Sequence, residues 1–153
     1  MKIEQIRLYQ VKQKLPTLFK TSYGVKTHKN CILISLHTQG LVGWGECVAS
    51  EHPSYSYETV KTARHILEDF LIPIAMQYDL DTVDDLPDFS SIRGHFIAKA
   101  ALENALWDLL AKSQDVSLSQ IIGGVKTKVE IGCSIGIQKD IPTLLDKVAT
   151  KLD

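Results

Sequence analysis

The side chains of this 153-residue chain that could do chemistry are scattered rather than clustered. Histidine and cysteine bind metals at short, regular spacings, and a glutamate can act as a general acid or base. The five histidines share no such spacing, and the three cysteines form no metal-binding pattern. Glu46, in Gly-Trp-Gly-Glu-Cys, is better explained as a strand-end residue hydrogen-bonded to a loop. The residues alone therefore predict no catalytic residue and no metal site.

Composition and charge indicate a globular protein and argue against some classes of partner. Apolar residues make up 44% of the chain and charged residues 23%, which is typical of a globular domain. The net charge is -1 with scattered lysines and arginines, so we expect no nucleic-acid partner. The N-terminus has no apolar signal core, and no apolar run approaches a membrane span. We interpret Cys31, Cys47 and Cys133 as reduced, buried thiols of a cytoplasmic protein without membrane partners.

The first third of the chain is expected to form strands. Residues 2–15 mix β-branched and polar side chains and predict a strand, and Pro16 to Gly24 is predicted as a loop. Two apolar runs flank Thr38-Gln39-Gly40, which is typical of a β-hairpin. The three strands together predict a small antiparallel meander.

Helices are expected to follow. Ser56 is the predicted N-cap of a helix with Glu58 in its first turn, and Pro73 is expected to end or kink that helix. The strongest helical pattern runs over residues 96–112 and is apolar over most of its circumference, so this helix should be buried on several sides. A short helix is predicted to begin at Ser117.

The side chains of the segment Val129–Ile137 alternate between the two faces of a predicted strand. One face of the predicted strand is apolar, and the other carries small residues with the hydroxyl of Ser134 near its end. This pattern suits a strand of a β/α barrel, whose small residues face a crowded or ligand-bearing interior. Asp140 is predicted to cap the following helix, which completes one βα unit. We expect the barrel to be cut off after this unit.

A longer motif carries a family resemblance. Residues 98–124, Ala-Lys-Ala-Ala-Leu-Glu-Asn-Ala-Leu-Trp-Asp-Leu-Leu-Ala-Lys and onward to Gly-Gly, resemble the signature of the mandelate racemase and muconate lactonizing enzyme group of the enolase superfamily. Ile122 departs mildly from that signature. Residues 19–24, 43–47 and 52–59 are most similar to those of the o-succinylbenzoate synthases and N-acylamino acid racemases.

The resemblance implies a fold and a division into domains. The implied class is α+β, with an enolase-like N-terminal capping domain over residues 1–125 that holds the three-stranded antiparallel meander and helices. Residues 126–153 would supply the first strand and helix of the (β/α) barrel, and the remainder of the barrel is absent.

The resemblance also implies substrate-binding residues. Phe19 and Tyr23 match substrate-facing positions of the first capping-domain loop, and Ser50 and Tyr55 match those of the second. Ser134 matches a barrel residue beside the substrate. The expected substrate is a small carboxylate.

The implied chemistry is abstraction of a proton next to that carboxylate. The enediolate that forms needs Mg²⁺ and lysines, a combination well described for the enolase superfamily. Dehydration of the enediolate serves menaquinone synthesis, and reprotonation gives racemisation. The family's lysines and metal carboxylates lie on later barrel strands, so the 153-residue chain alone is expected to bind no Mg²⁺ and to be inactive.

Two alternatives stay open at this point. One is a dipeptide epimerase or another muconate-lactonizing-type enzyme of the same superfamily. The other is a truncated, stand-alone binding or assembly module without catalysis. In either case we expect a homo-oligomer, or association through the unpaired C-terminal segment.

Overall fold

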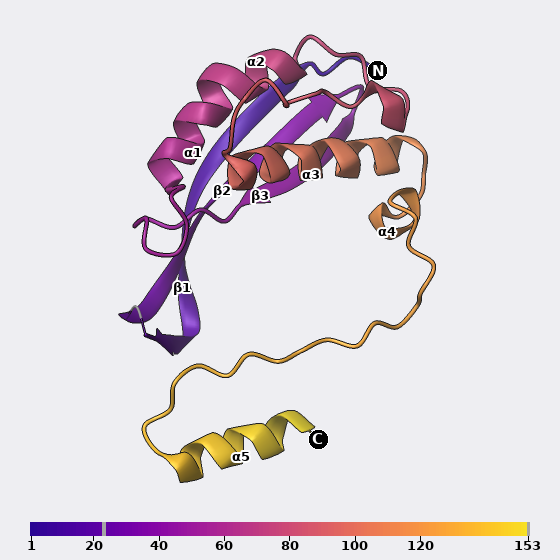
Figure 1. The fold of residues 1–153 in the computed structure, drawn as a ribbon. Helices are drawn as coiled ribbons and strands as arrows, with labels where there is room; N and C mark the ends of the chain where they lie inside the picture. Colours follow the sequence, from indigo (N-terminus) through magenta and orange to yellow (C-terminus); the bar gives the residue numbers. More distant parts are fainter. Residues whose placement is uncertain (23, 153) are drawn as a thin grey trace. The chain divides into compact units, whose positions relative to one another are not determined.

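A computed structural model describes residues 1–22 and 24–152 and divides the chain into two compact units (Figure 1). The first unit contains residues 1–12 and 30–125, and the second contains residues 13–29 and 126–153. Among the described residues, no helix is both long and apolar enough to cross a membrane. The predicted boundary after residue 125 stays a prediction.

The predicted three-stranded antiparallel meander is confirmed. Strands β1 (Gln5–Thr21), β2 (Gly24–Thr38) and β3 (Leu41–Cys47) are hydrogen-bonded in that order. At the β2–β3 turn, Thr38 pairs with Leu41, and both Gln39 (φ 42°) and Gly40 (φ 81°) have positive φ. Two such residues are what a two-residue hairpin turn needs to match the twist of its strands.

The predicted loop from Pro16 to Gly24 is wrong over most of its length. Strand β1 continues through Pro16 to Thr21, and β2 already begins at Gly24. Proline is tolerated more readily here because β1 is an edge strand, where about half of the backbone N–H groups point away from the neighbouring strand.

Helices cover one face of the sheet (Figure 1). They are α1 (Val60–Ile66), the π-helical turn Leu67–Leu71, α2 (Ile72–Ala75) and α3 (Phe96–Ser113). A 3-10 turn, Val83–Asp85, and the short helix α4 (Leu118–Ile121) complete this unit. The core is formed by fully buried side chains of the sheet and of α3, among them Ile32, Ile34, Leu36, Leu102, Leu106, Leu109 and Leu110.

Local signals located α3 and α4 correctly but not the start of α1. Ser117 caps α4 as predicted, by accepting a hydrogen bond from the Gln120 amide. The N-cap of α1 is Thr59 and not Ser56, because the Thr59 hydroxyl accepts from the Thr62 amide. Pro73 is predicted to end or kink this helix. The helix does not end there, but its α-helical pattern is interrupted by the π-helical turn directly before α2, and Pro73 lies in the first turn of α2.

Helix α3 lies directly against the backbone of β3. Gly43 and Gly45 face α3, and a Cβ on Gly45 would come within 2.0 Å of the Ala101 carbonyl oxygen. The outer edge of β3 is also closed by side chains of α3. The Trp44 amide donates to Asp108 (2.8 Å), and Lys112 donates to the Val42 carbonyl (2.8 Å).

The second unit contains no strand at Val129–Ile137, so that prediction is wrong. The segment carries no regular secondary structure, and the Ile137 amide at its end donates to the Lys20 carbonyl (3.0 Å). An extended segment becomes a strand only when a neighbour pairs with it along its length. Within residues 1–22 and 24–152 no such ladder forms.

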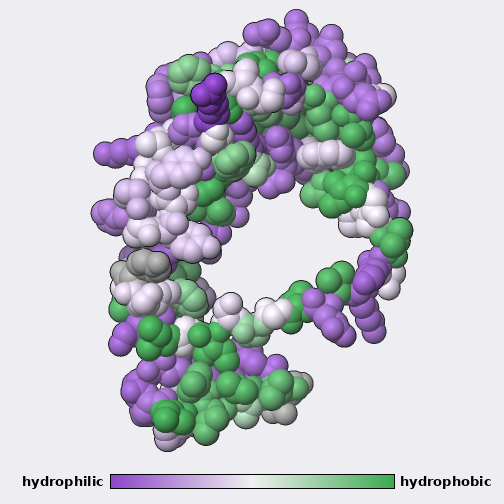
Figure 2. All heavy atoms as spheres, viewed as in Figure 1, coloured by the Kyte–Doolittle hydropathy of each residue, from purple (hydrophilic) through white to green (hydrophobic). Residues whose placement is uncertain are grey.

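Helix α5 (Ile141–Leu152) follows, capped as predicted by Asp140, which accepts from the Thr143 amide (2.8 Å). Apolar side chains gather over α5 in Figure 2. The exposed ones are Ile141, Leu144, Leu145 and Leu152.

The cysteine prediction is confirmed in part. Cys31 and Cys47 are buried, whereas Cys133 is exposed. Cys133 lies in the segment Val129–Ile137, where no ladder covers it. Burial, reinforced by the negative charge of Glu58, raises the pKa of the Cys47 thiol, so it resists forming the reactive thiolate.

Candidate functional site

The second predicted substrate loop connects β3 to α1. Its two ends lie side by side, because Ser50 and Thr59 form a parallel bridge and the Val60 amide donates to the Ser50 carbonyl (2.9 Å). Tyr55, at the apex, is 87% exposed. Ser50 therefore lies at the closed base of the loop, and the Tyr55 ring is free to contact a ligand.

A buried carboxylate holds this loop against α3. Glu58 is 1% exposed and accepts hydrogen bonds from the Ile97 (2.8 Å) and Ala98 (3.1 Å) amides, at the positive end of the helix. The preceding residue, Tyr57, accepts from the His95 amide (2.9 Å). The sequence pattern placed Glu58 in a first turn of its own helix, and no local signal pointed to α3.

The first predicted substrate loop is described in the second unit. The Phe19 ring lies beside Gly136, since a Cβ on that glycine would be 3.3 Å from the ring and 3.1 Å from the Lys20 carbonyl oxygen. Ser134, two residues before Gly136, is exposed. The structure therefore brings Phe19 alongside the segment that carries Ser134. Tyr23 lies outside the described residues.

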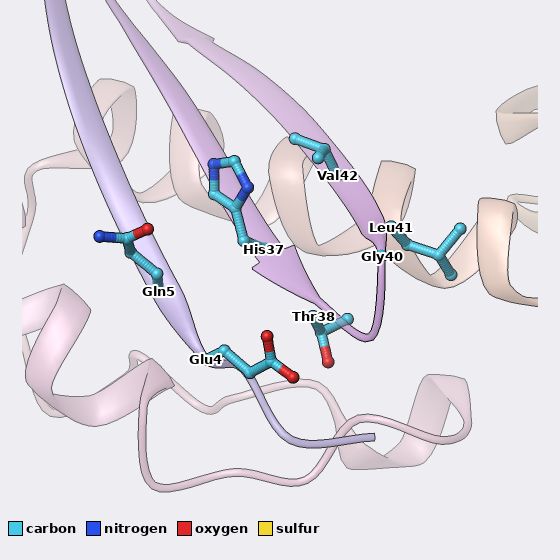
Figure 3. Close-up of a pocket in the computed structure, with 7 residues that line it drawn as sticks. All are labelled: Glu4, Gln5, His37, Thr38, Gly40, Leu41 and Val42. Atoms are coloured by element: carbon cyan, nitrogen blue, oxygen red, sulfur yellow. The ribbon is translucent and has the colours of Figure 1, made fainter.

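A cavity of about 610 Å³ opens at one end of the sheet and involves none of the predicted site residues (Figure 3). Several of its polar side chains hold the end of the hairpin. Glu4 accepts from the Gln39 amide (3.2 Å), and Thr38 donates to the Lys2 carbonyl. His37 is bonded to Ser35 (2.8 Å). These polar groups have structural partners, so we assign the cavity no ligand.

The described residues do not fit a Mg²⁺ site. Magnesium prefers several oxygen ligands at near-octahedral geometry. Across residues 1–22 and 24–152, no three histidine, cysteine, aspartate or glutamate side chains come together in a group that could hold a metal. The Phe19 loop belongs to the second unit and the Tyr55 loop to the first, and each is described by itself.

Comparison with known proteins identifies the family to which this fold belongs. Residues 3–123 match the family described as mandelate racemase / muconate lactonizing enzyme, N-terminal domain. The chain belongs to this family. The capping-domain fold predicted from residues 98–124 is thereby confirmed, and the signature residues around Asp108 and Lys112 are those that close the edge of β3.

Relatives of this capping domain are enzymes. The o-succinylbenzoate synthase of Geobacillus stearothermophilus is 45% identical over 148 residues, which is 95% of this chain and 40% of the synthase. The N-succinylamino acid racemase of Thermus thermophilus is 38% identical over 100% of this chain and 42% of the racemase.

The fold itself is matched by solved structures. A member of the enolase superfamily from Listeria innocua superimposes with a TM-score of 0.90 at 36% identity, covering 99% of this chain and 42% of that protein. The chain therefore spans about two fifths of the length of the relatives that it matches.

Proposed function

We propose that residues 1–153 supply the substrate-recognition part of an o-succinylbenzoate synthase. The observation that carries this proposal is the 45% identity to a synthase over almost the whole chain. Two aromatic residues are available to contact substrate, Phe19 beside Gly136 and the exposed Tyr55. Ser134, Ser50 and Tyr23 are each proposed as further contacts to a small carboxylate.

In this proposal the chain's own residues bind and shield rather than transfer protons. Aromatic side chains that close over a substrate exclude water, which strengthens electrostatic interactions at the reacting carbon. The Mg²⁺ that stabilises an enediolate and the lysines that move the proton belong to barrel strands outside residues 1–153. The proposed product would feed menaquinone synthesis.

Racemisation of N-succinylamino acids is the second candidate. A racemase from Thermus thermophilus is 38% identical over the whole chain, whereas an L-Ala-D/L-Glu epimerase is 21% identical, which favours racemisation over dipeptide epimerisation. Both candidate reactions begin with the same proton abstraction, so one recognition surface could serve both substrates.

The proposal can be tested in a hybrid enzyme. The hybrid joins residues 1–153 of this chain to the remaining three fifths of the Geobacillus stearothermophilus synthase. We expect Phe19→Ala to raise KM about tenfold, because an aromatic ring that loses contact with substrate costs on the order of 1–2 kcal/mol of binding. The matched control is the neighbouring Leu18→Ala, since Leu18 is 69% exposed and on the other face of β1. Equal kinetics for both variants would contradict the role of Phe19.

We also propose that this 153-residue chain self-associates through α5. Ile141 (71% exposed) and Leu145 (62%) lie on one face of that helix, and apolar area left in water costs about 25 cal/mol per Å². We expect sedimentation velocity to show concentration-dependent association that Ile141→Lys with Leu145→Lys abolishes. The control Thr150→Lys, on the opposite face of α5, should still associate. A wild-type chain that stays monomeric at high concentration would refute this proposal.

A further inference from the structure

We infer that Tyr57 and Glu58 form a clamp that positions Tyr55 for substrate recognition. The inference rests on the proposed function, in which Tyr55 contacts the substrate. Neither clamp residue reaches that substrate itself in this account. Both act through the loop from Ser50 to Thr59, and they are positioning residues.

The geometry of the loop shows where it is fixed. Its base is closed by the Val60 amide, which donates to the Ser50 carbonyl (2.9 Å). The apex, residues 51–55, is exposed. Between apex and base, the consecutive residues Tyr57 and Glu58 both turn toward the start of α3. The clamp therefore lies between the residue to be positioned and the base of the loop.

The start of α3 lacks a cap of its own. His95 occupies the N-cap position with φ 53°, and its side chain makes no capping hydrogen bond. Helices usually satisfy their first amides with a serine, threonine, aspartate or asparagine at this position. Here Glu58, which is distant in sequence, accepts from the Ile97 and Ala98 amides instead.

Capping α3 with the distant Glu58 costs desolvation free energy that a cap at the N-cap position would avoid. A carboxylate that is 1% exposed loses its hydration, and it is stable only because two amides and the positive end of α3 replace the water. A local cap would satisfy the helix but would not connect it to the loop. The buried Glu58 does both, so it fastens the loop to the start of α3.

Tyr57 provides the second attachment. Its hydroxyl oxygen accepts from the His95 amide (2.9 Å), and a Cβ on Gly94 would lie 2.7 Å from that oxygen. Gly94 also has φ +67°, a conformation that favours glycine. The chain before α3 is thus shaped to let the Tyr57 hydroxyl approach its backbone.

The clamp predicts how rigid the backbone of the loop is, and this can be measured without an enzyme assay. In the 153-residue chain, we expect the ¹⁵N order parameters of residues 51–52 and 54–56 to fall from about 0.85 to below about 0.6 in Glu58→Gln, with a smaller fall in Tyr57→Phe. Glutamine keeps one acceptor oxygen but places an N–H₂ group against the second amide. Unchanged order parameters in both variants would overturn the clamp.

The positioning role is tested in the hybrid enzyme by a double-mutant cycle. We expect Tyr57→Phe to raise KM about fivefold with kcat within twofold of the unmutated hybrid. The double variant with Tyr55→Ala should be no worse than Tyr55→Ala alone, since residues that act through one group are not additive. Ser117→Ala, which removes the cap of α4, controls for lost stability and should leave KM unchanged.

The outcomes separate the clamp from the proposed function. Additive effects of Tyr57→Phe and Tyr55→Ala would overturn the positioning role even if the loop loosens. A KM shift of the same size in Ser117→Ala would assign the effect to stability and would also overturn it. A folded hybrid without turnover would refute the proposed function, and the order parameters would still decide whether the clamp exists.

Discussion

Replacing Gly45 by alanine is expected to destabilise the capping domain by about 3 kcal/mol, at the upper end of the usual cost of overpacking a core. The added Cβ would lie 2.0 Å from the Ala101 carbonyl oxygen and 3.0 Å from the Ala105 amide nitrogen. Both are backbone atoms of α3, so no side chain can rotate away. Helix α3 must move off β3, which also breaks the hydrogen bond between the Trp44 amide and Asp108.

Thermal and urea unfolding of Gly45→Ala should measure this loss, with Tm lower by about 10 °C for a chain of this size. The control is Gly132→Ala, because a Cβ on Gly132 meets no atom within 4 Å and the residue has no positive φ. We expect the control to unfold like the wild type. A Gly45→Ala variant with unchanged Tm would mean that α3 does not pack on β3 as described.

The second large effect concerns catalysis. The 153-residue chain alone is expected to show kcat/KM at least about 10⁴-fold below that of the hybrid enzyme, since positioned acid–base groups alone contribute 10²- to 10⁴-fold. The reason is chemical, because we propose that the proton-transfer lysines and metal carboxylates come from the part of the enzyme that corresponds to the three fifths of the relatives outside this match. Added Mg²⁺ should not change the result. Turnover that copurifies with the chain and survives contamination controls would contradict this expectation.

Features encoded by neighbouring residues could be predicted from the sequence. The β2–β3 hairpin and the caps at Ser117 and Asp140 depend on a few consecutive side chains, and each lies where its pattern indicates. Helix α3 was also located, because the apolar pattern over residues 96–112 identifies a buried helix whatever surrounds it. The family resemblance supplied the capping-domain fold.

Features that depend on distant partners could not be predicted. Alternation at Val129–Ile137 suits a strand, but pairing is a property of two segments, and the pattern of one cannot supply the other. Glu58 looked like a first-turn residue of its own helix, whereas its carboxylate caps α3 some forty residues later. Of the predicted site, the structure places Phe19 beside the segment of Ser134, and Tyr55 at an exposed apex.

The central claim, that this capping domain recognises the substrate of an o-succinylbenzoate synthase, is tested most directly by steady-state kinetics of the purified hybrid. Formation of o-succinylbenzoate should proceed in the presence of Mg²⁺ with kcat/KM within about tenfold of the parent synthase, because the hybrid keeps the parent's catalytic part and altered recognition contacts change mainly KM. N-succinylamino acid racemisation should be measured on the same preparation. A folded, soluble hybrid that catalyses neither reaction, beside a parent synthase that is active under identical conditions, would contradict the account.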